Sequence, residues 1–189
     1  VELGPLRLHV LRSYQIKRQL GSEDPAAPLR NYLETQPLDS NVRSVFAESL
    51  LGNNELSAAA AEYERVVAEE PQNFAALNNL AWIVREQDSQ KALEYARRAS
   101  NLAPDSGEVL DTLAVIEYLN KDYNRASRTI ERALKASPDN PSIIYHSAMI
   151  AAASGDEATA RNTLKSLLEA DQDFPESEEA RALLAELED

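Results

Sequence analysis

The sequence predicts an all-α protein built as a solenoid of stacked helical hairpins. The prediction comes from regularly spaced prolines, from alanines that repeat with the same spacing, and from a composition that suits helices. Of 189 residues, 43% are apolar, only 6% are aromatic and only five are glycine. This composition favours closely packed helices over sheets.

The prolines give the length of the repeat. Pro37, Pro71, Pro104 and Pro138 lie 34, 33 and 34 residues apart. Proline lacks a backbone N–H and clashes with the preceding helical turn, so each of these residues should end the second helix of a hairpin. A repeat of this length is typical of two helices joined by a turn.

Two series of alanines repeat with nearly the same spacing. They are Ala47, Ala81, Ala114 and Ala148, and Ala59, Ala92, Ala126 and Ala160. A small side chain at a fixed place lets paired helices approach closely. Each series has one interval of 33 residues, Ala81–Ala114 in the first and Ala59–Ala92 in the second. These intervals overlap only between Ala81 and Ala92, so we expect the shortening in the inter-helix turn at Arg85–Gln90.

The spacing predicts four hairpin repeats, over residues 40–73, 74–106, 107–140 and 141–174. Polar residues follow three of the prolines and should cap the next helix: Gln72-Asn73, Asp105-Ser106 and Asp139-Asn140. Residues 176–188 predict a capping helix with Ala180, Leu183, Leu184 and Leu187 directed inward. Its outward acidic residues would close the solenoid with a polar face.

Residues 1–38 predict a divergent or partial repeat. One helical face is formed by Leu3, Leu6, Val10, Leu11 and Tyr14. Gly21 should stop that helix, and Asp24-Pro25 should provide the N-cap and first position of the next one. The chain begins at Val1, so we expect a piece of a longer protein with any targeting signal upstream.

The charge distribution bears on partners and membranes. The net charge is −13, and residues 31–189 alone hold 14 basic and 29 acidic residues, a net of −15. This surface should repel phosphate backbones, so we expect no nucleic-acid partner. Because no apolar run approaches about 18 residues, we expect no membrane insertion either.

The sequence offers little for catalysis. The absence of cysteine excludes disulfides, thiolate metal sites and cysteine nucleophiles. The two histidines, His9 and His146, are far apart, whereas a zinc site needs three or four ligands. The five glycines are isolated and form no phosphate-binding loop. We therefore predict no enzymatic activity, no metal and no cofactor.

The two central repeats carry a family pattern. Its first half is Leu77-Asn78-Asn79-Leu80-Ala81-Trp82 and Leu110-Asp111-Thr112-Leu113-Ala114, and its second half is Ala126, Ile130, Ala133 and Pro138. The pattern resembles the tetratricopeptide repeat, closely over residues 40–174 and weakly over 3–38. The resemblance implies antiparallel hairpins wound into a right-handed superhelix. The chain departs from the pattern at Arg43 and Ser147, where apolar residues are usual, and at Gln172, where proline is usual.

A narrower resemblance rests on further segments: Leu102-Ala103-Pro104-Asp105, Ser137-Pro138-Asp139-Asn140-Pro141, Tyr145-His146 and Gly155-Asp156. These are similar to the C-terminal end of bacterial tetratricopeptide-repeat lipoproteins tied to PEP-CTERM sorting and exopolysaccharide systems. That resemblance implies a scaffold in the periplasm or cell envelope, with the cytoplasm as the alternative.

The family resemblance also implies a partner-binding groove on the first helix of each hairpin. Carried over residue by residue, the groove comprises Asn41, Ser44, Val45, Glu48, Ala75, Asn78, Asn79, Trp82, Arg85, Glu108, Asp111, Thr112, Val115, Tyr118, Ser142, Tyr145, His146 and Met149. Aromatic residues there could anchor a partner, and asparagines could bind its backbone amides. Alternatively, Trp82, Tyr118 and Tyr145 pack between helices.

Two functions remain open from the sequence. The first is a non-catalytic scaffold that binds a peptide or protein segment in the groove. The second is an assembly module that stacks on further repeats or self-associates through the apolar N-terminal face, as a homo-oligomer. An acidic C-terminal tail is a poor ligand for the groove, because Ser44, Glu48 and Glu108 stand where basic residues would be needed.

Overall fold

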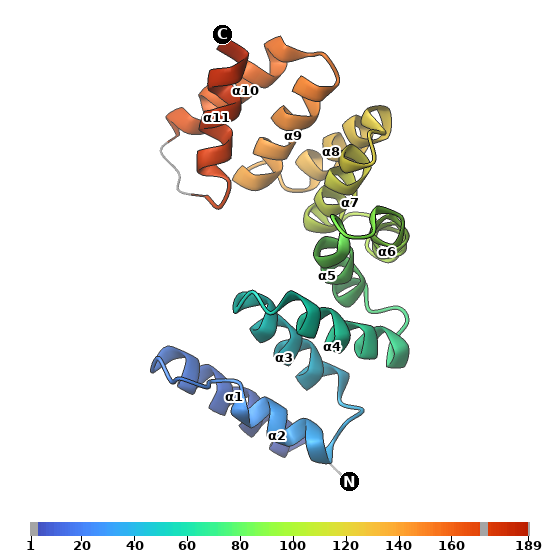
Figure 1. The fold of residues 1–189 in the computed structure, drawn as a ribbon, viewed down its shortest axis with the longest axis vertical. Coiled ribbons are helices and arrows are strands. Elements are labelled where there is room, and N and C mark those ends of the chain that lie inside the picture. Colours follow the sequence, from blue (N-terminus) through green and yellow to red (C-terminus); the bar gives the residue numbers. More distant parts are fainter. Residues whose placement is uncertain (1–3, 171–173, 189) are drawn as a thin grey trace. The chain divides into compact units, whose positions relative to one another are not determined.

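The computed structural model describes residues 4–170 and 174–188, and every regular element in these ranges is a helix (Figure 1). In chain order, the helices of this part are α1 (Gly4–Gln19), α2 (Ala27–Thr35), α3 (Ser40–Gly52), α4 (Leu56–Glu69), α5 (Phe74–Val84), α6 (Ser89–Leu102), α7 (Gly107–Leu119), α8 (Tyr123–Ala136), α9 (Pro141–Ala153), α10 (Glu157–Glu169) and α11 (Ser177–Glu188). The predicted all-α hairpin architecture is confirmed.

The chain divides into two compact units, Val1–Ile83 and Val84–Asp189. In the first unit, α1 packs on α2, α2 on α3, and α3 on α4. In the second unit, each helix from α6 to α11 packs on the next, and α7 also packs directly on α9. Packing between consecutive helices is the expected arrangement of a helical repeat, in which each hairpin buries its apolar face against its neighbours.

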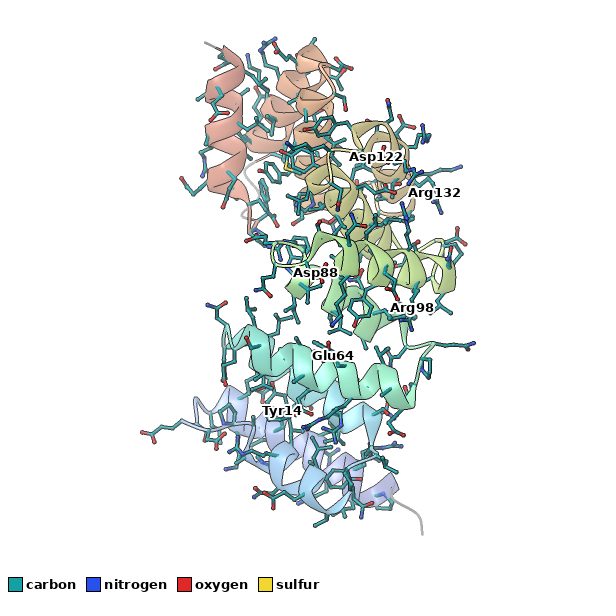
Figure 2. The ribbon with its side chains drawn as sticks, turned by 45° about the vertical axis from the view of Figure 1, so that its right-hand side comes forward. Tyr14, Glu64, Asp88, Arg98, Asp122 and Arg132 are labelled. Carbon is teal, nitrogen blue, oxygen red and sulfur yellow. The ribbon has the colours of Figure 1, made fainter. Side chains whose placement is uncertain are left out.

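Repeated caps fix where the helices begin. Asn73, Ser106 and Asn140 each accept a hydrogen bond from a backbone N–H in the first turn of α5, α7 or α9, as predicted. A second series was missed from the sequence: Asp88, Asp122 and Asp156 cap α6, α8 and α10. Figure 2 shows Asp88 and Asp122 at these helix starts. In α4 the cap position holds Glu55, whose side chain makes no capping bond.

The repeated alanines are all buried. All eight are at most 1% exposed. In the second unit, Ala114 of α7 and Ala126 of α8 share one core with Leu110, Ile130 and Ile143. Because no side chain larger than alanine separates these backbones, the pattern read from the sequence is a packing requirement.

The capping helix closes the second unit as predicted. Ala180 of α11 is fully buried beside Tyr145 of α9 and Phe174. Leu183, Leu184 and Leu187 pack against the same core. The acidic residues Glu178 and Glu179 of this helix are exposed.

The N-terminal hairpin confirms one prediction and corrects another. Gly21 does follow α1 with a left-handed φ of 65°, but Asp24-Pro25 does not begin α2. The helix starts at Ala27 with Pro28 in its first turn, and Asp24 instead forms an ion pair with Arg30. The turn therefore runs two residues further than the Asp-Pro signal suggested, and the N-cap residue is Ala26. Its side chain makes no capping bond.

The predicted apolar face of α1 is only partly buried. Val10 and Tyr14 are buried in a core with Leu29, Tyr32, Leu33 and Val42, whereas Leu6 is 51% exposed. Leu3, like Gln172, lies outside the described residues. Within the described ranges, no helix has both the length and the apolar character needed to cross a bilayer.

Polar residues at usually apolar positions are satisfied locally. Arg43 of α3 is buried and forms an ion pair with Glu62 of α4. Glu62 also accepts a hydrogen bond from the exposed Arg65 at 2.9 Å. Ser147 of α9 donates its hydroxyl to the carbonyl of Ile144 at 2.7 Å. These departures from the family pattern therefore leave the hairpins intact.

Arg43→Ala should lower the free energy of unfolding by about 3 kcal/mol, because Glu62 would lose its buried partner and keep only the exposed Arg65. Replacing both residues, as Arg43→Met with Glu62→Leu, should recover most of this loss, since no unpaired charge remains. Urea unfolding followed by circular dichroism measures both effects. Arg65→Ala is the control and should cost less than about 1 kcal/mol. An equal loss for Arg43→Ala and Arg65→Ala would contradict the assignment.

Candidate functional site

In the first unit, the expected groove positions remain accessible. On α3, Asn41 and Glu48 are exposed, and Ser44 and Val45 are half-buried. On α5, Ala75 is exposed, and Asn78, Asn79 and Trp82 are half-buried. We call the side chains at the predicted groove positions of α3 and α5 the first-helix surface.

The two neighbouring asparagines of α5 have different environments. Asn79 donates its side-chain amide to the hydroxyl of Tyr63 at 2.8 Å, which ties α5 to α4. The side-chain oxygen of Asn78, in contrast, is buried and has no hydrogen-bond partner in the part of the chain that the structure describes. Leaving a buried acceptor unpaired costs about 1–3 kcal/mol. Asn79 is thus structural, whereas Asn78 is an unsatisfied acceptor on the first-helix surface.

Glu48 is the charged residue of this surface on α3. Loss of water around its carboxyl group raises the pKa of Glu48 above the ordinary value. Burial, together with the nearby negative charge of Glu48, raises the pKa of Tyr63 far above its ordinary value, and the hydrogen bond from Asn79 opposes the rise. Glu48 therefore influences both the exposed surface and the buried Tyr63.

In the second unit, five predicted groove residues are enclosed. Asp111 and His146 pair with each other, and Nδ1 of His146 lies 2.9 and 3.0 Å from the two carboxylate oxygens. The five enclosed residues are Asp111, Thr112, Val115, Tyr145 and His146, each at most 9% exposed. The direct packing of α7 against α9 accounts for the Asp111–His146 pair. As they stand, these five side chains present almost no area to a partner.

The other predicted positions of the second unit are more open. Glu108 is exposed, and Arg85, Tyr118, Ser142 and Met149 are half-buried. The ring of Tyr118 lies 5.8 Å from that of Tyr123, and Ser142 donates its hydroxyl to Glu176 at 2.7 Å. On α7 and α9, the side chains accessible to a partner are therefore Glu108 and parts of Tyr118 and Met149.

One buried acid was missed from the sequence. Glu117 of α7 is 5% exposed and accepts a hydrogen bond from Thr129 of α8 at 2.7 Å. Loss of water is the largest influence on the pKa of Glu117 and raises it, and the bond from Thr129 opposes the rise. The only sequence signal was a single acid between Ile116 and Tyr118 in an otherwise apolar stretch of helix.

The described residues include no group of three or more histidine, aspartate or glutamate side chains that could hold a metal ion. His146 is instead committed to Asp111, and the neighbouring Ser147 donates its hydroxyl within its own helix. Neither arrangement provides an activated nucleophile.

Comparison with known families identifies the repeat. Two models of the tetratricopeptide repeat match residues 45–108 and 117–187. The chain is a tetratricopeptide-repeat protein. Tetratricopeptide-repeat proteins are typically non-catalytic scaffolds for interactions with proteins or peptides. No curated protein sequence matches this tetratricopeptide-repeat chain significantly.

Solved structures show the same fold. PilW, described as a widely conserved type IV pilus biogenesis factor, matches 94% of this chain and 82% of its own at 21% identity, with a TM-score of 0.75. PilF of Pseudomonas aeruginosa matches 96% of this chain and 88% of its own at 21% identity, with a TM-score of 0.74. YrrB, described as a tetratricopeptide-repeat protein with an unusual peptide-binding site, matches 86% and 82% at 17% identity, with a TM-score of 0.66.

Glu117→Gln should raise the melting temperature at neutral pH, because it removes a buried charge and keeps an acceptor for Thr129. The pKa of Glu117 is raised in the folded state, so its charged form destabilises the fold above that pKa and the penalty disappears as the pH falls. The difference between variant and parent should therefore shrink on acidification. Thermal unfolding from pH 4 to pH 8 tests this, with the exposed Glu131→Gln as control. A difference independent of pH would contradict the assignment.

Proposed function

We propose that this protein is a non-catalytic adaptor that binds an extended segment of a partner protein on its first-helix surface. Members of the family are typically interaction scaffolds, and the accessible part of this surface combines polar side chains with the aromatic ring of Trp82. Rings of this kind bury a large area while keeping polar contacts, which suits partner recognition.

The observation that carries the proposal is the unpaired oxygen of Asn78. A rotation of this half-buried side chain would turn the oxygen outward, where the backbone N–H of an extended segment could donate to it. Binding would then remove a penalty that the unbound protein carries. The neighbouring Asn79 cannot rotate in the same way, because its amide nitrogen donates to the hydroxyl of Tyr63.

The charge of the surface favours a neutral or basic segment. Glu48 is exposed on α3, and residues 31–189 carry a net charge of −15. An acidic tail would meet repulsion on this helix.

We further propose that the adaptor acts in a bacterial envelope system for sorting or exopolysaccharide export. The support is the resemblance of its C-terminal repeats to envelope tetratricopeptide-repeat lipoproteins. Its fold is also shared with PilW, which is described as a type IV pilus biogenesis factor.

Asn78→Ala should reduce partner capture about tenfold without loss of stability, because the mutation removes an unpaired buried acceptor. The measurement is a pull-down from envelope and cytosolic extracts, beside thermal unfolding. Asn101→Ala, at an exposed position of α6, is the matched control and should leave capture unchanged. Capture that survives Asn78→Ala, or a fall in stability with capture unchanged, would make Asn78 a structural residue and overturn the proposal.

A second candidate function, self-assembly, has one specific observation in its favour. Leu6, Leu8, Ile16 and Leu20 at the N-terminal hairpin are between 48% and 79% exposed. Leu6, Ile16 and Leu20 fall on one side of the helical path, next to the buried face of Val10. An apolar strip of this kind is typical of a surface that packs on another helix.

If this strip mediates assembly, light scattering should show a mass above that of one chain that rises with concentration. Replacing Leu6, Ile16 and Leu20 by glutamine should return the protein to a monomer, because the apolar area gained on association is removed. Replacing the isolated Leu8 by glutamine is the control. A monomer at all concentrations for the parent protein would exclude self-assembly through this face.

A further inference from the structure

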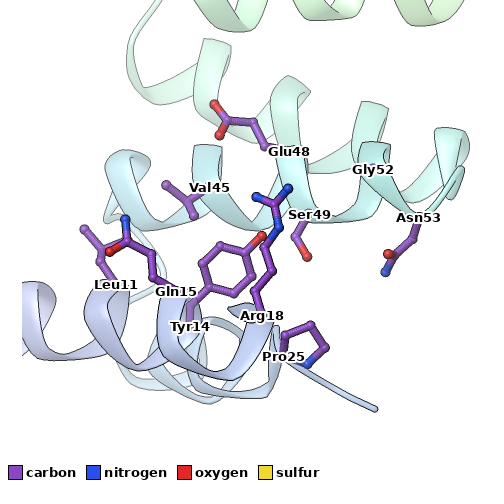
Figure 3. Close-up of a pocket in the computed structure, with 10 residues that line it drawn as sticks. All are labelled: Leu11, Tyr14, Gln15, Arg18, Pro25, Val45, Glu48, Ser49, Gly52 and Asn53. Carbon is purple, nitrogen blue, oxygen red and sulfur yellow. The ribbon is translucent and has the colours of Figure 1, made fainter. Parts of the chain in front are cut away.

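A cavity of about 330 Å³ lies between α1 and α3 within the first unit (Figure 3). Leu11, Tyr14 and Arg18 line it from α1. Val45, Glu48 and Ser49 line it from α3. Its volume is at the lower end of the range for small-ligand sites, about 300–1,000 Å³. Glu48 belongs also to the first-helix surface, but the α1 side of the cavity was not expected from the sequence.

Opposite charges face this cavity from its two sides without pairing. In the described ranges, neither Arg18 nor Glu48 has a partner within ion-pair distance, although both line the same space. Elsewhere in this unit, opposite charges do meet, as Arg30 and Asp24 do. The guanidinium and the carboxylate therefore line the same space without forming an ion pair with each other, and each can contact a ligand there.

Two hydroxyl groups lie beside Arg18 in this cavity, on residues that are largely buried. Tyr14 is 7% exposed and Ser49 is 9% exposed, and Figure 3 shows the Tyr14 hydroxyl and the Ser49 side chain beside Arg18. Among the described residues, neither hydroxyl has a hydrogen-bond partner, whereas the hydroxyl of Ser44 donates to the carbonyl of Ser40. Both are available to donate to an acceptor in the cavity.

The two opposite charges of Arg18 and Glu48 favour a ligand that carries both a positive and a negative charge. A simple anion at Arg18 would be repelled by Glu48, and a simple cation at Glu48 would be repelled by Arg18. A ligand with an ammonium group and a carboxylate satisfies both residues at once. Leu11 and Val45 add apolar area that suits a short aliphatic part.

We propose that the cavity between α1 and α3 binds a zwitterionic amino-acid unit. Its ammonium group contacts Glu48, and its carboxylate contacts Arg18 and accepts from the hydroxyls of Tyr14 and Ser49. This chemistry is found in a free amino acid and in a C-terminal lysine of a polypeptide. The proposal goes beyond the adaptor function, because a free amino acid would bind whether or not the first-helix surface holds a partner.

Calorimetry with three related peptides tests the ligand class on the full chain. The first is an acetylated tetra-alanine peptide extended by a C-terminal lysine with a free carboxylate. The second has the same sequence with a C-terminal amide, and the third carries norleucine in place of lysine. The first peptide should bind about tenfold more tightly than either of the others, since each of them lacks one charge-assisted contact.

Two variants test which group of the ligand Arg18 and Glu48 each bind. Arg18→Gln should abolish the preference for the free carboxylate over the amide and keep the preference for lysine over norleucine. Glu48→Gln should do the reverse. Arg12→Gln on α1 and Glu34→Gln on α2 are exposed charge-matched controls and should keep both preferences.

Free lysine and free glycine test whether the ligand is a free amino acid or the C-terminal lysine of a polypeptide. Binding of free lysine or glycine as tight as that of the first peptide indicates a free amino acid, and binding of the peptide alone indicates a chain terminus. No binding of any of these ligands, or equal weakening of all peptides by both variants, would overturn the proposal. Neither result affects the adaptor function, whose test is the response of partner capture to Asn78→Ala.

Discussion

The close approach of paired helices at the repeated alanines is the constraint on which the structure depends. A two-helix hairpin cannot bury its apolar stripe alone, so each hairpin relies on the next. The alanines, at most 1% exposed, let the backbones approach closely enough for Leu110, Ile130 and Ile143 to fill the space between them. Close packing then fixes which face of each first helix remains accessible. The candidate binding surface is therefore a consequence of small side chains placed elsewhere.

Sequence reasoning succeeded where the signal was local and repeated. Proline spacing, alanine spacing and the caps Asn73, Ser106 and Asn140 all act within one helix turn or recur in every repeat. It failed at Asp24-Pro25, because a second proline at position 28 offered an equally good helix start. It also could not divide the groove into open and closed parts. Asp111 and His146 are 35 residues apart, and nothing in either segment shows that they pair with each other rather than with a ligand.

Polar contacts across helix pairs explain why residues of similar type have different roles. Arg43 with Glu62, Tyr63 with Asn79, and Glu117 with Thr129 each join two helices. A buried polar group of this kind is costly without its partner, so it favours one register of the helices over others. Asn78 breaks this rule, since its oxygen is buried without a partner. An exception among otherwise satisfied groups is more informative about binding than polarity alone.

Glu48 links the two candidate sites of the first unit. It lines the cavity on the α1 side of α3, and its charge also acts on Tyr63, which holds Asn79 of α5. A cation placed beside Glu48 would offset the cost of its lost hydration. It would also weaken the attraction between Glu48 and a basic segment lying along α3. Occupation of the cavity and binding of a basic segment on the first-helix surface should therefore oppose each other to the same extent, as thermodynamic linkage requires of two sites that share one charged group.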